Sequence, residues 1–214
     1  MGVVVSDASL DSVFPDDLVP DLFRIVCRAW PGVGSLAPNT REDKISRKLA
    51  VRMRRGVRSA GLAVAVLSQH EVLDREDGEV IGKIDIVVMV GRDEQVYLSF
   101  ESKRLNVAYP SGFRSDADKY CDRGMVRYIT EQYAAGLGRG GMIGYVMDGR
   151  CNAAIKAVSS AIAQRRTPLR LQGESPFQPS SPLPSCENAR DSHHKTVTER
   201  AFTIHHLLLA VETS

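Results

Sequence analysis

Alternating apolar and polar positions mark two neighbouring segments near the middle of the chain. Within residues 79–105, even-numbered positions are mostly apolar: Val80, Ile84, Ile86, Val88 and Val90 before a polar break, then Val96, Leu98 and Phe100 after it. This period of two predicts two β-strands, each with one face in a core. The break at Gly91–Gln95 predicts a hairpin loop. A loop symmetrical about Asp93 places Asp85 directly opposite Glu101, with Cβ atoms roughly 5 Å apart.

Apolar stripes elsewhere predict further helices and strands. We expect helices at about 15–30, 40–60, 115–137 and 151–164, and strands at 142–147 and 202–211. The apolar run Gly61–Leu67 fits either a first strand or the end of the preceding helix. Thr40 is expected to cap the second helix, and the glycine-rich segment 138–141 is expected to be a turn. The order of elements predicts an α/β fold with a central mixed sheet of about four to five strands flanked by helices.

Composition shifts divide the chain into four predicted parts. Residues 1–38 are expected to form an N-terminal helical extension, and residues 39–166 the core. Residues 167–190 are rich in proline and serine, which is typical of a loop. Residues 191–214 are expected to supply a C-terminal strand that packs on the core.

Charge and cysteine content exclude some classes of protein. The chain has 214 residues and a net charge of +2, so its overall charge favours no particular partner. Its four cysteines are widely spaced, without a C-x-x-C pair, which argues against an ordinary zinc site and favours a reduced, cytoplasmic protein. The chain contains no run of about 18 apolar residues, so no membrane span is predicted, and no secretory signal is indicated.

Asp85 and Glu101 are the first candidates for chemistry. Opposed carboxylates repel each other, so a cation is expected between them, and Mg²⁺ takes oxygen ligands of this kind. Lys103 shares a strand face with Glu101. Acid-x-Lys triplets also occur by chance on solvated strand faces. The position of Asp85 within the apolar run Ile84–Val88 favours a functional role, because a buried carboxylate costs several kcal/mol unless it is paired or coordinated.

Asp85 followed by Glu101-Ser102-Lys103 on the next strand resembles the motif of the PD-(D/E)XK nuclease superfamily, which has a restriction-endonuclease-like fold. Ile84 stands where that family usually has proline. The resemblance implies a nuclease that hydrolyses DNA with Mg²⁺, with Mn²⁺ as a substitute ion. It implies that Asp85, Glu101 and the Ser102 backbone carbonyl hold the metal, while Lys103 assists the attacking water.

Many members of that superfamily carry another acid on the helix before the hairpin, and Glu42 is the matching position. It lies three residues before Ile45 of the apolar stripe, on the buried side of the first turn. The resemblance therefore implies a fourth metal ligand or a group that orients water. The alternative is an acid that only offsets the helix dipole, a role that Asp43 already fills.

Basic residues crowd the other faces of the same helix. They form either a phosphate-binding surface or a solvated face, and the sequence leaves both open. The residues expected to contact nucleic acid are Lys44, Lys48, Arg52, Arg104 and His193. RNA is not excluded as the substrate.

Two further expectations concern partners. A small nuclease domain usually needs a second copy or a protein partner, and by analogy this suggests a host-defence or repair complex. The alternative function is a catalytically silent nuclease fold that binds nucleic acid or a protein.

Overall fold

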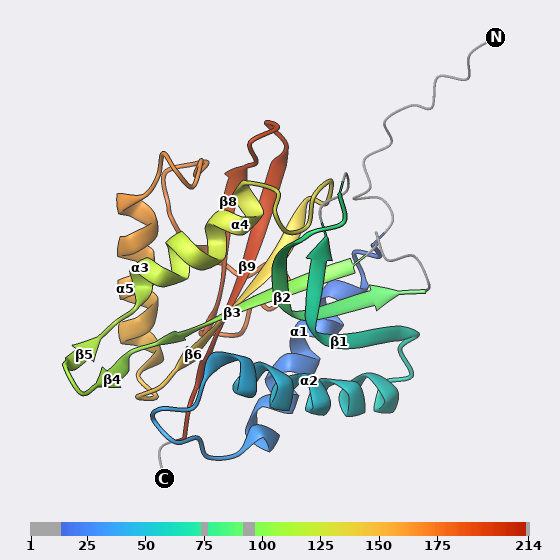
Figure 1. Cartoon of the computed structure of the whole chain (residues 1–214), viewed down its shortest axis with the longest axis horizontal. Helices are drawn as coiled ribbons and strands as arrows, with labels where there is room; N and C mark the ends of the chain where they lie inside the picture. Colours follow the sequence, from blue (N-terminus) through green and yellow to red (C-terminus); the bar gives the residue numbers. More distant parts are fainter. Residues whose placement is uncertain (1–13, 74–76, 92–96, 213–214) are drawn as a thin grey trace.

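A mixed sheet of seven strands runs through the computed structural model, which describes residues 14–73, 77–91 and 97–212 (Figure 1). The strand order is β1-β2-β3-β6-β9-β8-β7. These strands span Val64–Leu73, Val80–Val90, Tyr97–Leu105, Arg139–Val146, Ala201–Ala210, Ala189–Lys195 and Gln178–Pro179, respectively. β1, β2 and β3 are antiparallel, β3, β6 and β9 are parallel, and β8 and β7 continue antiparallel. The predicted α/β class is confirmed, and the sheet is larger than the predicted four to five strands.

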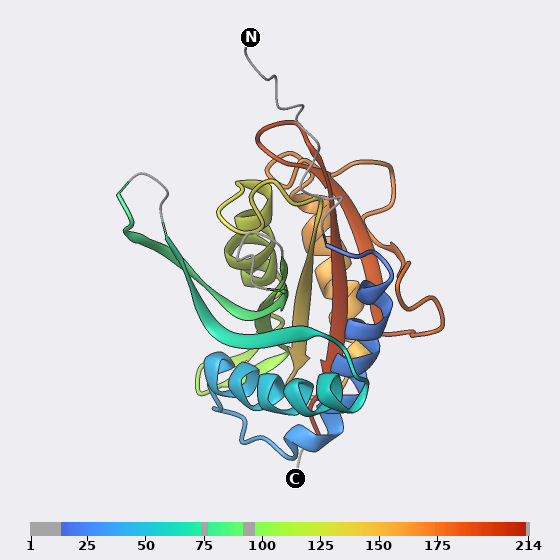
Figure 2. The ribbon, with the colours of Figure 1, turned by 90° about the vertical axis from the view of Figure 1, so that its right-hand side faces the viewer.

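Helices cover both faces of this sheet, as Figure 2 shows from the side. One face carries α1 (Leu18–Ala29), the 3₁₀ turn η2 (Trp30–Val33) and α2 (Glu42–Ser59), and the other carries α3 (Ala117–Tyr120), the π-helical segment η3 (Cys121–Met125), α4 (Val126–Ile129) and α5 (Cys151–Gln164). Alternate residues of one strand therefore enter different cores: Leu207 packs on the α1 and α2 side, and Leu208 on the α5 side. β4 (Val107–Tyr109) and β5 (Gly112–Arg114) form a separate small hairpin.

The predicted register of the central hairpin is confirmed. β2 pairs with β3 through Ile86 opposite Phe100 and Met89 opposite Tyr97, which is the pairing expected from a loop centred on Asp93. Residues 92–95 of that predicted loop, and Val96 of the predicted second strand, lie outside the described residues. The run 61–67, which the sequence left open, belongs largely to β1.

Two predictions about helices are wrong. The helix expected at 115–137 ends at Ile129, and Glu131 and Ala134 then adopt left-handed conformations that turn the chain. The second helix begins at Glu42 with Arg41 at the cap position, and no side-chain hydrogen bond from the described residues caps it. Thr40 instead uses its backbone carbonyl to accept a hydrogen bond from the Arg104 guanidinium.

The glycine-rich segment 138–141, predicted as a turn, mostly belongs to strand β6. A Cβ on Gly140 would lie 2.5 Å from Cε1 of Tyr128, and a Cβ on Gly141 would lie 2.4 Å from Cδ1 of Phe100. Glycine is required here because aromatic rings pack directly onto the strand backbone from both faces.

The C-terminal part of the chain holds two long strands. The predicted strand 202–211 matches β9, whereas β8 was not predicted. The segment predicted as a proline-rich loop contains β7 and buries Leu169, Leu171 and Leu183. Adjacent His205 and His206 point to opposite faces as expected: the first ring contacts Phe23 of α1, and the second contacts Tyr120 of α3.

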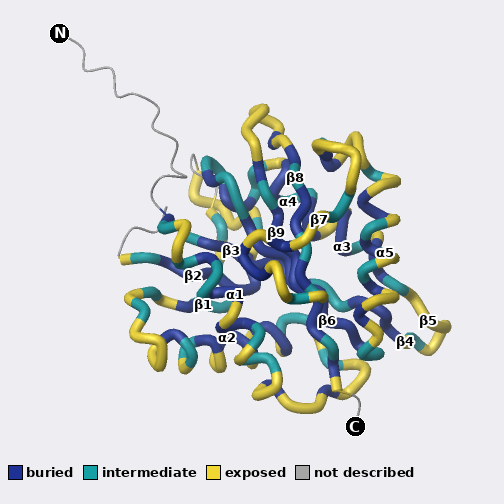
Figure 3. The backbone as a smooth tube through the Cα atoms, turned by 180° about the vertical axis from the view of Figure 1, so that it is seen from behind, coloured by how far each residue is buried: buried dark blue, intermediate teal, exposed yellow. Residues whose placement is uncertain are grey.

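Burial is deepest in the middle of the sheet and falls toward its outer helices (Figure 3). β6 is almost wholly buried, while the outward face of α2 is exposed. Within the described ranges, no helix combines the length and apolar character needed to cross a membrane.

Candidate active site

The candidate site lies where two strands separate. β2 stays paired with β1 along most of its length, but its described pairing with β3 stops at Ile86. On its opposite edge, β3 pairs with β6 from Phe100 onward. β2 thus leaves one edge of β3 at the position of Asp85.

Along this edge of β3, backbone N–H groups donate to carboxylates and not to a neighbouring strand. The Ser102 N–H donates to Oδ2 of Asp85 at 2.9 Å, and the Arg104 N–H donates to Oε2 of Glu42 at 2.9 Å. These two N–H groups are two residues apart, so they point the same way from the strand. At this fork between β2 and β3, Asp85 of β2 and Glu42 of α2 therefore both accept hydrogen bonds from the backbone of β3.

The Lys103 ammonium lies among three of the four predicted metal ligands. Its Nζ is 2.6 Å from Oε1 of Glu101, 2.8 Å from the Ser102 carbonyl oxygen and 3.2 Å from Oε1 of Glu42. We call Glu42, Asp85, Glu101, Ser102 and Lys103 the acid cluster. The structure brings together all five residues that the family resemblance predicted.

Glu101 is deeply buried, and its hydrogen bonds are the least complete in this cluster. Its side chain is 2% exposed, and its Oε2 has no hydrogen-bond partner among the described residues. Burial raises the pKa of Glu101 to about 7, although Lys103 opposes the shift. A buried carboxylate oxygen without a partner is costly, and a cation would relieve that cost.

The pKa values of two other members of the cluster, Asp85 and Lys103, are also shifted. Burial raises the pKa of Asp85 above its ordinary value, against the attraction of Lys103. Burial opposes the charge on Lys103, but Glu101 and Glu42 together raise its pKa. The lysine is therefore held as an ammonium, while the two buried acids compete for one positive charge.

A glutamine that the sequence did not reveal also contacts Asp85. Gln69 of β1 donates from Nε2 to Oδ1 of Asp85 at 2.8 Å. Its φ is 58°, and it lies between the pairs Ser68–Ile86 and His70–Ile84, whose common register places it opposite Asp85. No sequence pattern indicates the left-handed backbone conformation of this residue.

The second face of the sheet contributes an arginine and two tyrosines. Arg127 donates from Nη1 to Oε1 of Glu101 at 3.3 Å, and its guanidinium lies 5.1 Å from the centre of the Tyr133 ring. The Tyr128 hydroxyl accepts from the Glu101 N–H and donates to the Gly141 carbonyl. With Arg127 counted beside Lys103, two cations face the three carboxylates of the cluster, and one negative charge is left over when all are ionised.

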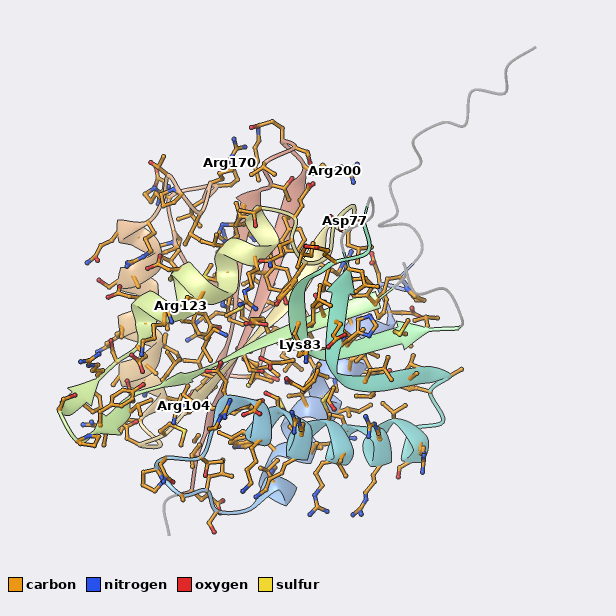
Figure 4. All side chains as sticks on the ribbon, in the orientation of Figure 1. Asp77, Lys83, Arg104, Arg123, Arg170 and Arg200 are labelled. Carbon is orange, nitrogen blue, oxygen red and sulfur yellow. The ribbon has the colours of Figure 1, made fainter. Side chains whose placement is uncertain are left out.

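The cluster is reached through a cleft of about 290 Å³. Its lining combines acids and arginines: Arg41, Glu42, Asp43, Asp85 and Arg104. Arg104 lies beside the start of α2 (Figure 4). Solvent or a phosphate can therefore approach Asp85 and Glu42, while Glu101 lies deeper.

The donor atoms suit a hard divalent cation in kind. Glu42, Glu101 and the Ser102 carbonyl offer oxygens that already surround a positive charge, and the unpartnered Oε2 of Glu101 is a further donor. Among the described residues, no group of three or more acidic, histidine or cysteine side chains is arranged as a ready metal site. The ammonium of Lys103 fills the space between the oxygens, so a metal ion would have to displace it.

The remaining predicted contacts are dispersed. Lys44, Lys48 and Arg52 are exposed on α2, consistent with a surface that could meet a large ligand. His193 was predicted in a loop, but it lies in β8, which β6 and β9 separate from β3. Its Nδ1 is 3.2 Å from the Thr203 hydroxyl, and it takes no part in the acid cluster.

No protein-family model matches this chain, and searches of curated proteins and of solved structures also give no match. The acid cluster is therefore the basis on which a function is proposed.

Proposed function

We propose that this protein is a metal-dependent nuclease of the PD-(D/E)XK type, with a restriction-endonuclease-like core, that hydrolyses phosphodiester bonds of DNA. The observation that carries the proposal is the convergence of Glu42, Asp85, Glu101 and Lys103 at the fork between β2 and β3. A purely structural ion pair would leave no buried oxygen unpartnered, whereas Oε2 of Glu101 has no partner in the described structure.

Each side chain has a role that follows from its contacts. Backbone N–H groups fix the carboxylates of Asp85 and Glu42, so these acids stay in place when the cluster changes its charge. Lys103 supplies a buried positive charge that can stabilise a phosphate as negative charge develops on it. A bound Mg²⁺ or Mn²⁺ would supply Lewis acidity and lower the pKa of a water molecule.

Arg127 and Arg104 add positive charge on two sides of Lys103. Arg127 bonds the buried end of Glu101, and Arg104 lines the cleft that opens to solvent. Guanidinium groups bind phosphate oxygens in a fork, so Arg104 is placed to guide a phosphate toward Asp85.

A second candidate function is favoured by one observation. Because the Lys103 ammonium bonds Glu42, Glu101 and the Ser102 carbonyl, and Arg127 also bonds Glu101, two of the three carboxylate charges are balanced without a metal. A catalytically silent nuclease fold that binds nucleic acid or a protein would show the same contacts. Cleavage and metal binding separate the two candidates.

The test is cleavage of supercoiled plasmid, single-stranded DNA and RNA by the purified protein with Mg²⁺ or Mn²⁺. We expect cleavage of DNA, and we expect Asp85→Ala and Lys103→Ala to reduce its rate by about 100-fold or more. Lys83→Ala is the matched control, because Lys83 forms an exposed ion pair with Glu71 on the same sheet. Plasmid cleavage that survives in Asp85→Ala would refute the assignment, and binding without cleavage by the parent would favour the silent fold.

A further inference from the structure

A second site is formed where α1 and α2 lie side by side on the sheet (Figure 1). The two helices approach closely at Gly56, since a Cβ there would lie 2.9 Å from Cγ2 of Ile25. Beside this contact is a cleft of about 350 Å³, whose lining consists of Ile25, Arg28, Ala29, Gly32, Arg52, Arg55, Gly56, Ser59 and Ala60. No residue of the acid cluster is part of this described lining, so the two clefts are separate.

Three arginines give the cleft its charge, and nothing in its lining offsets them. Arg28 comes from α1, while Arg52 and Arg55 come from α2, and all three are exposed. None of them forms an ion pair within the described ranges. By contrast, Arg24 on the same α1 helix bonds Asp21, so nearby arginines do find acids when acids are present.

The charge of α2 as a whole points to an extended anion. This helix carries seven basic and two acidic side chains, an excess larger than the net charge of +2 of the entire chain. The excess runs along the helix from Lys44 to Arg58. One of these residues, Arg47, pairs with Asp43, and the remaining excess of positive charge along the helix is typical of a surface that binds a nucleic-acid backbone.

The distance from the acid cluster suits the same ligand. Arg52 and Arg55 follow Glu42 by 10 and 13 residues, which is roughly 15 to 20 Å along an α-helix. One strand of a DNA duplex carries a phosphate about every 3.4 Å of helix axis, so this distance corresponds to about five nucleotides. A strand cut at the acid cluster could therefore reach the cleft.

We propose that the cleft of Arg28, Arg52 and Arg55 is a second phosphate-binding site that holds the nucleic-acid backbone away from the site of cleavage. The choice of nucleic acid as the ligand rests on the proposed nuclease function. The guanidinium groups of the three arginines can bind phosphate oxygens, and Ile25 and Ala29 form the apolar part of the cleft lining.

The test is binding measured without cleavage. Fluorescence anisotropy of a labelled DNA duplex of about 20 base pairs is followed in EDTA at several salt concentrations. For Arg28→Ala/Arg55→Ala we expect Kd to rise about 10-fold and the salt dependence to lose roughly two phosphate contacts. Thermal unfolding of each variant checks that it is folded.

Lys156→Ala/Arg200→Ala is the matched control, since it removes the same charge from exposed positions on α5 and just before β9 (Arg200 is labelled in Figure 4), neither of which lines the cleft. We expect it to change Kd much less than the cleft variant. Equal effects of the two variants would overturn the proposal, because they would show a response to net charge alone.

A second arm distinguishes the backbone from a free phosphate compound. Pyrophosphate binding is measured by calorimetry for the parent and for Arg28→Ala/Arg55→Ala. If the variant loses pyrophosphate binding but keeps its affinity for the duplex, the assignment to nucleic acid is wrong. Failure of the parent to cleave DNA would refute the nuclease function, but the anisotropy data in EDTA would still decide the role of the cleft.

Discussion

Two groups of buried polar side chains lie on the same sheet, and they differ in whether their hydrogen bonds are complete. The acid cluster lies at the fork between β2 and β3. The second group, which we call the histidine cluster, consists of Tyr120, Ser192, His194 and His206, around β8 and β9. The histidine cluster and Glu101 of the acid cluster are shielded from water, so their polar atoms must be satisfied internally or at a cost.

The histidine cluster satisfies every polar side-chain atom with one arrangement of protons. The Leu169 carbonyl can only accept, so His194 carries its proton on Nδ1 and accepts from the Ser192 hydroxyl at Nε2. Ser192 then accepts from Nε2 of His206, whose Nδ1 accepts from the Tyr120 hydroxyl. Both imidazoles are neutral, and burial keeps the pKa of His194 down to about 4.

The acid cluster has no such solution. Its carboxylates share too few donors: Glu101 leaves Oε2 without a partner in the described structure, and burial raises the pKa of both Glu101 and Asp85. Complete networks of this kind stabilise a fold, whereas incomplete and charged ones mark sites that bind something. The comparison therefore assigns a structural role to the histidine cluster and a functional role to the acid cluster.

The largest expected effect is on stability, from the histidine cluster. His206→Leu leaves the hydroxyls of Ser192 and Tyr120 without a shared partner, so we expect the free energy of unfolding to fall by about 3 kcal/mol. Urea unfolding measures this loss. The folded fraction should cleave DNA at the rate of the parent.

The matching change in the acid cluster should reduce cleavage strongly and leave the free energy of unfolding nearly unchanged. Glu101→Gln removes a buried charge, so we expect little loss of stability above pH 7 and a loss of cleavage of about 100-fold or more. If Glu101→Gln unfolds as readily as His206→Leu, the contrast between the two clusters fails.

The pH dependence of stability should differ in sign between the clusters. Glu101 has a raised pKa in the folded state, so its contribution to stability is present below pH 4.5 and is lost as the pH rises through about 7. His194 has a lowered pKa, so its contribution is present above pH 6.5 and is lost as the pH falls toward about 4. Each slope reaches at most about 1.4 kcal/mol per pH unit.

Removing either Glu101 or His194 should therefore leave the pH dependence of stability that the other residue produces. Between pH 4.5 and 6.5 we expect the stability of Glu101→Gln to rise more steeply with pH than that of the parent, and the stability of His194→Gln to rise less steeply. Denaturant unfolding across this range makes the measurement. Identical slopes in the parent and both variants would contradict the burial of these charges.

The smallest expected effect comes from the glutamine beside Asp85. Asn tolerates the left-handed conformation of Gln69 but is one methylene shorter, so Gln69→Asn should lose the hydrogen bond to Oδ1 without straining β1. Loss of such a supporting group lowers metal affinity or activity by about 10-fold. Cleavage rates at increasing Mn²⁺ concentration test this, and an unchanged rate at every concentration would remove Gln69 from the site.

The sequence predicted the acid cluster because strand alternation fixes register. A loop centred on Asp93 predicted Asp85 opposite Glu101. The observed pairing of Ile86 with Phe100 has that register, but the described pairing of β2 with β3 ends there, one residue before the two acids would pair. The place of Lys103 among the oxygens, and the approach of Arg127 and Gln69, depend on the separation of β2 from β3 and on an irregular strand. These are tertiary features that local patterns do not encode.

The missed parts of the fold have related causes. β8 buries Asp191, Ser192 and His194, so its inward positions are polar and show no apolar alternation. β6 begins with glycines that resemble a turn but serve to admit the rings of Tyr128 and Phe100. In both strands the neighbours decide the structure, and single-sequence patterns cannot supply those neighbours.

The most direct test of the central claim is calorimetric titration of Mn²⁺ into the parent, Glu101→Gln and Lys103→Met. Methionine keeps the length of the lysine side chain but removes the ammonium from among Glu42, Glu101 and the Ser102 carbonyl. If these oxygens are the metal ligands, the parent binds Mn²⁺, Glu101→Gln binds about 10-fold more weakly or not at all, and Lys103→Met binds more tightly than the parent. Equal binding by all three proteins, or none by any of them, would contradict the assignment of the acid cluster as a metal site.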